Sequence, residues 1–329
     1  MQGKMDCHGL SDIGRVRKSN QDQFLIADLS KSMRVYQTSL SIEDQTRLFG
    51  GSQGKLLLVA DGVGGNLAGD RASTLAVDSV TTYVLNNMRW LFQLDEQLED
   101  DFLDDLKCAL EHSQQQISAE AASIPARKGM GTTTTMAYIV WPRLYVIHAG
   151  DSRCYLLRNF KLKQITTEHT VAQQFVDEGV LGPEDAETSQ WANVLWNVVG
   201  CGSDELNPEA YKAELKLDDT LLLCTDGLSK HVSDEQIARL LNTDVNAEEA
   251  CRRLVDAANE AGGTDNITVV IARFRDRDEQ EDALEAEVGL DEVIARTGAD
   301  TETQTVTAGD VPETELVREG LGETPNSTV

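Results

Sequence analysis

Two aspartate residues stand directly after apolar runs and directly before a glycine. The two stretches are KLLLVADG, which contains Asp61, and TLLLCTDG, which contains Asp226. A strand that is apolar on both faces is buried in a sheet, so each carboxylate is expected where the sheet opens to solvent, and the glycine would let the backbone approach a ligand closely. A third aspartate, Asp265 in GGTDNITVVIARF, stands before an expected strand, whereas the first two stand at the ends of theirs.

Carboxylates in this pattern indicate a site for hard divalent cations. Aspartates that gather at strand ends repel one another unless cations hold them together. Oxygen ligands suit Mg²⁺ or Mn²⁺, whereas zinc favours the His or Cys that these motifs lack. A single Asp-Gly pair is more often a turn or a helix cap, but its repetition favours a metal site.

Other familiar chemistries are missing from the sequence. No cysteine is followed six positions later by Arg, so the thiolate loop of tyrosine phosphatases is excluded. The stretch GGSQGKL is one residue too short for a phosphate-binding P-loop, and neither GxSxG nor HExxH occurs. If the protein is an enzyme, its chemistry must come from carboxylates.

The elements that position these residues are predicted to be antiparallel strands interrupted by helices. The breaks between successive strand-like runs are too short for anything but antiparallel neighbours; the runs are Gly131 to Val140, Leu144 to His148, Arg153 to Arg158 and Lys161 to Thr166. Apolar periodicity and capping residues predict helices in pairs; these are 70–91 with 95–122, and 233–241 with 246–261. The polar interval Lys31 to Lys55 is interpreted as a hairpin extension or loop. The order favours an α+β fold of layered antiparallel sheets over a doubly wound parallel sheet.

The charge is uneven along the chain. Formal net charge is −27, which disfavours nucleic acid and anionic lipid as partners. Residues 276–329 carry sixteen acidic residues against three arginines and no aromatic residue. We expect a folded domain over 1–275 and a solvated, disordered tail over 276–329.

The sequence also bears on the compartment. It has no apolar run long enough to span a bilayer and no apolar signal core at its start, and its six cysteines are scattered without a CxxC pair. We therefore expect a cytoplasmic protein with no membrane segment.

Six motifs in order resemble the type 2C (PPM) metal-dependent serine/threonine protein phosphatases, specifically their bacterial branch. The resemblance covers nearly all of residues 10 to 274. The motifs are GRVRKSNQD (Gly14 to Asp22), DGVGG (Asp61 to Gly65), GTT (Gly131 to Thr133), GDSR (Gly150 to Arg153), TDGL (Thr225 to Leu228) and GGTDN (Gly262 to Asn266). For the fold, the resemblance implies two packed antiparallel β-sheets flanked by pairs of antiparallel helices, a four-layer α-β-β-α sandwich.

The resemblance also implies roles for individual residues. Asp61 would bridge two metal ions, with the Gly62 carbonyl as a further ligand of one, and Asp226 and Asp265 would complete the other site. Asp22 resembles the acidic residue that supports metal-bound water, and Asp151 resembles a carboxylate of a third, weaker metal site. Arg17 would clamp the substrate phosphate, because its planar fork can donate two parallel hydrogen bonds. Arg17, Asp61 and Asp226 are the expected catalytic residues.

The expected reaction needs no covalent intermediate. Two ions, Mn²⁺ or Mg²⁺, about 3.5 to 4 Å apart can hold one water between them, lower its pKa to roughly 7 and neutralise phosphoryl charge during in-line attack. The expected substrates are phosphoserine and phosphothreonine in proteins, with a bacterial-type Ser/Thr kinase as the opposing enzyme.

Three positions depart from the family pattern. Gln21 stands where many relatives have Glu, and a neutral amide is a poorer metal ligand. Lys230 stands where some relatives have Asp, so a cation there should weaken the third metal site or replace it as a fixed charge. Val63 stands where some relatives have a histidine that could act as general acid, so the sequence does not show which residue protonates the leaving group.

Two further segments carry predictions. His169 falls in the segment that precedes a flap in the family, and we expect it to cap or to hydrogen-bond locally. The flap is expected over roughly Val171 to Asn193, where substrate choice should reside, and Trp191 and Trp196 are interpreted as packing residues.

The competing hypothesis is a regulatory phosphoprotein-binding domain of the same fold that has lost turnover, because of Gln21 and Lys230. The tail adds a separate one, that its threonines in TETQTVT (Thr301 to Thr307) are phosphorylated or bind a phosphothreonine reader. A solubilising extension is the simpler interpretation of the tail.

Overall fold

The computed structural model describes residues 4–34, 47–64, 68–88, 96–186, 188–201 and 205–275. The chain divides into two units, Met1–Arg277 and Asp278–Val329. The predicted acidic tail, including Thr301 to Thr307, therefore lies outside the described residues, as does Gly65 of the DGVGG motif.

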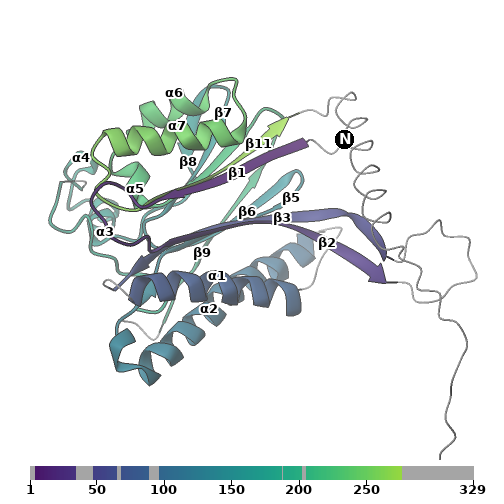
Figure 1. The fold of residues 1–329 in the computed structure, drawn as a ribbon, viewed down its shortest axis with the longest axis horizontal. Helices are drawn as coiled ribbons and strands as arrows, with labels where there is room; N and C mark the ends of the chain where they lie inside the picture. The colour runs from purple at the N-terminus through teal and green to yellow at the C-terminus, as the bar shows by residue number, and fades with distance from the viewer. Residues whose placement is uncertain are drawn as a thin grey trace, which may run out of the picture. The chain divides into compact units, whose positions relative to one another are not determined.

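Two antiparallel sheets form the centre of the described chain (Figure 1). The first sheet has the strand order β1-β11-β10-β7-β8. Its strands are β1 (Lys4–Asp12), β11 (Ile267–Arg275), β10 (Thr220–Cys224), β7 (Arg153–Arg158) and β8 (Lys161–Gln164). The second has the order β2-β3-β5-β6-β9, and β4 pairs with β3. Its strands are β2 (Asp22–Arg34), β3 (Arg47–Val63), β4 (Gly131–Thr132), β5 (Thr134–Val140), β6 (Arg143–Ala149) and β9 (Glu209–Glu214).

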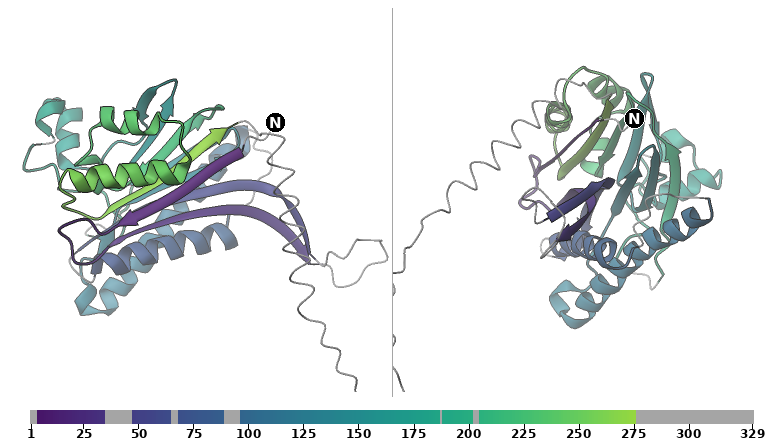
Figure 2. Two further views of the ribbon diagram at one scale, coloured as in Figure 1. Left: turned by 45° about the horizontal axis from the view of Figure 1, so that its top comes forward. Right: turned by 90° about the vertical axis from the view of Figure 1, so that its right-hand side faces the viewer.

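Helices cover the outer face of each sheet, so the layers run helix, sheet, sheet, helix. Figure 1 shows α6 (Asp234–Leu241) and α7 (Ala247–Glu260) above the first sheet, and α1 (Ala68–Asn86) and α2 (Glu96–Ser123) below the second. Figure 2 shows the same order from two other sides. The four-layer α-β-β-α sandwich predicted above is confirmed.

The described chain has three hydrophobic cores, one between the two sheets and one between each sheet and its helices. The alternation of side chains along the central strands explains them. In β3, Leu56 and Leu58 pack toward α1 and α2, while Leu57 and Val59 pack between the sheets. In β10, Leu222 packs toward α7, and its neighbours on either side join the core between the sheets. Successive side chains of a strand point to opposite faces, so a strand covered on both sides must be apolar throughout. This is why KLLLVA and TLLLC read as continuous apolar runs.

The helix termini follow capping chemistry. The Ser233 side chain accepts a hydrogen bond from the Gln236 backbone N–H at the start of α6, and the Asn246 side chain does the same for Glu249 at the start of α7. The predicted strands and helix pairs agree with the observed bounds to within a few residues, except that α1 ends at Asn86. The interval 31–55 is a hairpin extension, since β2 runs on to Arg34 and β3 begins at Arg47, with 35–46 outside the described residues.

Shorter helices complete the elements that the structure describes. They are η1 (Pro125–Arg127), α3 (Val171–Asp177), α4 (Pro183–Ala186) and α5 (Asp226–Ser229). The expected flap thus contains α3 and α4. Helix α5 directly follows β10, and Asp226 is its first residue.

Candidate metal centre

Asp22 and Asp61 face each other across neighbouring strands. Asp22 begins β2 and is paired in register with Asp61 near the end of β3. Residues directly opposite in an antiparallel pair hold their Cβ atoms about 4.5–5.5 Å apart, and like charges in that position destabilise the sheet. The register therefore brings together two of the predicted metal ligands at a cost in stability.

Asp22 also connects the two sheets. Its Oδ2 accepts hydrogen bonds from the hydroxyls of Thr225 (2.9 Å) and Thr268 (2.7 Å), which lie at the end of β10 and in β11. Its Oδ1 is buried without a hydrogen-bond partner. The pKa of Asp22 is raised to about 7, mainly by burial and also by the charges of Asp226 and Asp265, while the two threonine hydroxyls oppose the rise.

Asp61 is joined to Asp151 through two hydroxyl-bearing residues. The Thr133 hydroxyl accepts from the Asp61 backbone N–H (3.2 Å) and is hydrogen-bonded to the Ser152 hydroxyl (2.8 Å) beside Asp151. Burial raises the pKa of Asp61 well above the ordinary aspartate value, and the charges of the other four aspartates add to the rise. Burial and the charge of Asp226 raise the pKa of Asp151 to about 8, and its Oδ1 is buried without a hydrogen-bond partner.

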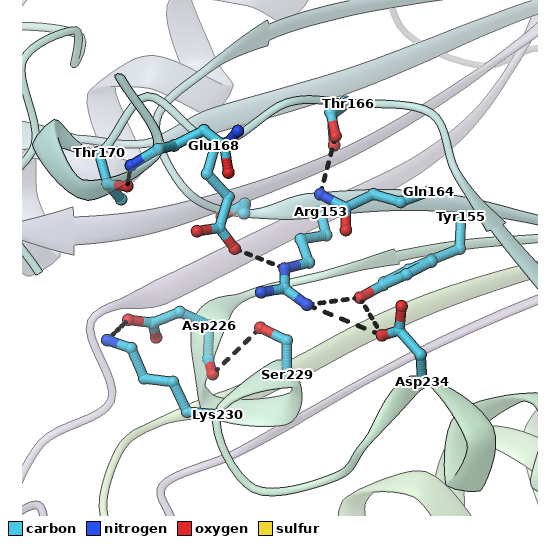
Figure 3. Close-up of polar contacts among 12 residues, drawn as sticks. Arg153, Tyr155, Gln164, Thr166, Glu168, Thr170, Asp226, Ser229, Lys230 and Asp234 are labelled. Atoms are coloured by element: carbon cyan, nitrogen blue, oxygen red, sulfur yellow. Dashed lines mark hydrogen bonds and ion pairs between the residues drawn. The ribbon is translucent and has the colours of Figure 1, made fainter. Parts of the chain in front are cut away.

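Asp226 carries an ion pair with a lysine one helical turn later. Its Oδ2 contacts the Lys230 ammonium, and its Oδ1 is buried without a hydrogen-bond partner. Figure 3 shows this pair beside the cluster formed by Arg153, Tyr155 and Asp234. Burial lowers the pKa of Lys230, but the charge of Asp226, a hydrogen bond to it and the charges of Asp151 and Asp61 together raise it by more.

Asp265 is paired with Arg17. The Arg17 guanidinium donates to Asp265 Oδ2 at 2.6 Å. The neighbouring Asn266 fixes the loop that carries Arg17, because its side-chain amide donates to the carbonyls of Ile13 and Ser19 (3.0 Å each) and its side-chain oxygen accepts from the Gln21 backbone N–H (2.9 Å). The GGTDN and GRVRKSNQD motifs are thus two parts of one structure.

The glycines after Asp61 and Asp226 are required by packing within the protein, a role that the sequence did not indicate; the close approach of the backbone to a ligand there stays a prediction. A Cβ on Gly62 would lie 2.2 Å from the Gly69 carbonyl oxygen, and one on Gly227 would lie 1.9 Å from the Asn266 carbonyl oxygen. The protein backbone itself fills the space that a side chain would need.

These carboxylates fit divalent cations by their chemistry. Three of them, Asp22, Asp151 and Asp226, each hold a buried oxygen without a hydrogen-bond partner, and buried polar atoms are normally satisfied. Within the described ranges, no three His, Cys, Asp or Glu side chains already stand as a metal cage. Two of the five carboxylates are turned onto the cations of Arg17 and Lys230 instead.

A cleft of about 840 Å³ opens beside Lys230. One wall comes from the expected flap and the residues before it, including Glu168 and Gln173, and the other from residues 229–235. Arg153, from β7, donates to Glu168 Oε1 (2.5 Å) and to the Tyr155 hydroxyl (2.8 Å) at the base of the cleft.

His169 hydrogen-bonds to segments far along the chain, contrary to the expectation that it caps or hydrogen-bonds locally. It is buried, its Nδ1 accepts from the Gly150 backbone N–H (3.2 Å) and contacts the Asn197 amide (2.9 Å), and its Nε2 lies 3.4 Å from Glu209. It therefore connects segments 19 and 28 residues away along the chain. Trp196 does pack, against the His169 ring at 5.0 Å, although the tryptophan remains 42% exposed.

The sequence reasoning placed the aspartates but missed the groups that hold them. Thr133, Thr225 and Asn266 were present in the recognised motifs without a role, and Thr268 carried no signal beyond its place in a strand. Gln21 has a structural part in addition to its departure from the family pattern, since its carbonyl accepts from the Gly62 N–H (3.2 Å) and the Ser73 hydroxyl (2.6 Å).

Known proteins match both the sequence and the fold. Residues 34–268 match the family described as protein phosphatase 2C. The serine/threonine protein phosphatase PstP of Mycobacterium tuberculosis is 37% identical over 224 residues, which are 68% of this chain and 41% of that protein. The chain thus spans about two fifths of the length of this relative. The serine/threonine phosphatase stp of Listeria monocytogenes is 31% identical over 216 residues, which are 66% of this chain and 83% of that protein.

A solved structure of a relative extends the match to three dimensions. The catalytic domain of PstP, in complex with two manganese ions, aligns with a TM-score of 0.64 at 32% identity, covering 83% of this chain and 99% of that one. No helix in the described part of the chain is long and apolar enough to cross a membrane. From the family match and from relatives similar in both sequence and fold, the chain belongs to the protein phosphatase 2C family.

Proposed function

We propose that this protein hydrolyses phosphoserine and phosphothreonine in other proteins with the help of two divalent ions, Mn²⁺ or Mg²⁺. The observation that carries the proposal is the convergence of Asp22, Asp61 and Asp226 from both sheets, where Asp22 and Asp226 each keep a buried oxygen that no hydrogen bond satisfies. The relatives named above as serine/threonine phosphatases, and the manganese complex of one of them, support it.

The residues that would hold the ions are Asp61, the Gly62 carbonyl, Asp226 and Asp265, with Asp22 beside them and Asp151 at the edge. When bound, the ions would supply an acidified water as nucleophile and would offset the charge of the phosphoryl group. They would also offset the burial and, after it, the repulsion from neighbouring carboxylates that raise the pKa values of Asp22 and Asp151.

Arg17 is proposed to bind the substrate phosphate. Its guanidinium is 48% exposed while one of its nitrogens donates to Asp265. A cation bound at Asp265 would release part of this ion pair, and the fork of N–H groups could then donate to two phosphate oxygens. Arg17 would thereby hold the phosphoryl group next to the carboxylates.

We assign this activity to residues 1–275 and regard the acidic segment 276–329 as an addition to the domain. The protein would act in the cytoplasm against a bacterial-type Ser/Thr kinase, whose phosphoproteins are its substrates. The cleft next to Lys230 is the proposed place for the residues that flank the phosphorylated side chain.

The direct test is hydrolysis of a phosphothreonine peptide by the purified protein with Mn²⁺. Chelation with EDTA should abolish turnover, and Asp226→Asn should lower kcat by at least about 100-fold, because a ligand charge is lost. Asp256→Asn, the same change at an exposed position of α7, should leave kcat unchanged.

Activity that survives both EDTA and Asp226→Asn would contradict the metal mechanism. Phosphopeptide binding without any turnover would instead support the regulatory domain, the alternative suggested by the ion pairs of Arg17 and Lys230 with Asp265 and Asp226. The two outcomes are read from the same preparation.

A further inference from the structure

Lys230 is a cation placed inside the acidic centre by local helix geometry. It follows α5, and its ammonium contacts Asp226 Oδ2 because residues four apart on a helix share a face. Figure 3 shows the side chain folded back toward the start of α5. The short helix therefore supplies both a proposed metal ligand and a positive charge that occupies one of its oxygens.

The same ammonium acts on a second carboxylate. Asp151 lies within range of the charges of both Lys230 and Asp226. Asp151 and Asp226 each keep a buried Oδ1 without a hydrogen-bond partner. Lys230 thus places one positive charge near both of these carboxylates.

A tethered ammonium and a divalent ion exclude each other at such a position. An ammonium carries one charge and needs no coordination shell, whereas a divalent ion needs several oxygens and repels a neighbouring cation. Because the lysine is part of the chain, its ammonium stays near the carboxylates at any protein concentration, whereas a free ion can dissociate. Any ion bound between Asp226 and Asp151 would have to displace it.

We propose that Lys230 is a built-in cation that takes the place of a further divalent ion between Asp226 and Asp151, and so limits the centre to two ions. The inference rests on the proposed function, since it presumes that Asp226 also serves the two-ion site. Lys230 is a positioning residue: it pairs with the Asp226 carboxylate, places its charge near Asp151 and has no part in bond making.

The test counts bound Mn²⁺ in the full chain from the paramagnetic resonance signal of free Mn²⁺. Wild type should bind two ions, and Lys230→Gln should bind one more, with an affinity at least about tenfold above that of any residual wild-type site. Lys230→Arg, which keeps the charge, should behave like wild type. The matched control is Lys212→Gln, because Lys212 is similarly exposed (42% against 41%) and pairs with Glu99 and Asp100 on α2.

Equal numbers of ions in wild type and Lys230→Gln would overturn the inference, as would an equal gain in Lys212→Gln. Thermal unfolding in EDTA shows whether each variant folds, and Lys230→Met, a second neutral variant, is counted in the same way if Lys230→Gln does not fold. Failure of the inference alone leaves Mn²⁺-dependent hydrolysis by wild type intact. If the proposed function is wrong, wild type itself shows no Mn²⁺-dependent hydrolysis.

Discussion

At the scale of single residues, the proposed metal centre holds carboxylates close together at a cost in stability. Asp22 and Asp61 are placed opposite each other across two strands, which is unfavourable when both are ionised. The hydroxyls of Thr225 and Thr268 stabilise only one oxygen of Asp22. A bound cation would offset this repulsion. Without one, the acidic cluster lowers the stability of the folded protein, as residues at functional sites often do.

Asp22→Asn should therefore stabilise the protein when metal is absent. The folded-state pKa of Asp22, about 7, lies above its ordinary value of 3.8, so the ionised carboxylate costs stability above pH 7 and this cost disappears as pH falls toward 4. In EDTA the variant should melt above wild type by several degrees at pH 8, and the gap should shrink at pH 5. A kcal/mol corresponds to about 2–4 °C for a chain of this size.

Differential scanning fluorimetry at the two pH values measures this gap. Addition of Mn²⁺ should reverse the order, because wild type gains more from the ion than the variant does. A variant that melts below wild type in EDTA at pH 8 would show that Asp22 is not under charge repulsion.

At the scale of elements, close backbone contacts hold the aspartates in place. Helix α5 meets the start of β11 so closely that Gly227 has no room for a side chain, since its Cβ would lie 1.9 Å from the Asn266 carbonyl oxygen. Asn266 in turn fixes the loop with Arg17. Displacement at this contact would move Asp226, Asp265 and Arg17 together.

Gly227→Ala should lower both stability and activity. Overpacking of this kind costs about 1–3 kcal/mol, and the obstacle here is backbone, which cannot rotate away. Gly182→Ala is the control, because its Cβ would meet only the Asp185 side chain at 3.2 Å. Chemical denaturation and the phosphopeptide assay report the two effects, and a Gly227→Ala protein with wild-type stability and kcat would refute this role of the contact.

Sequence reasoning reached most elements and the aspartates because these depend on local patterns. Alternation and turn residues predict β5 to β8, and the capping residues Ser233 and Asn246 predict α6 and α7. It could not find that Thr268 contacts Asp22, or that His169 contacts Gly150 and Asn197, because those contacts join residues far apart in the chain. The purpose of Gly62 and Gly227 was likewise visible only once the strands had been packed.

At the scale of the whole molecule, two sheets bring one centre together from distant parts of the chain. Asp22 and Asp61 come from the second sheet, while Asp226 and Asp265 lie at the end of β10 and before β11 of the first. The net charge of −27 attracts divalent cations and repels phosphate in general. Arg17 and Lys230 each bring a positive charge into this acidic setting.

The most direct measurement is anomalous diffraction from crystals of this protein grown with Mn²⁺. We predict two manganese peaks bounded by the carboxylates of Asp61, Asp226 and Asp265, with the Arg17–Asp265 ion pair rearranged. An absence of peaks in that position, or ions held only by other residues, would contradict the account.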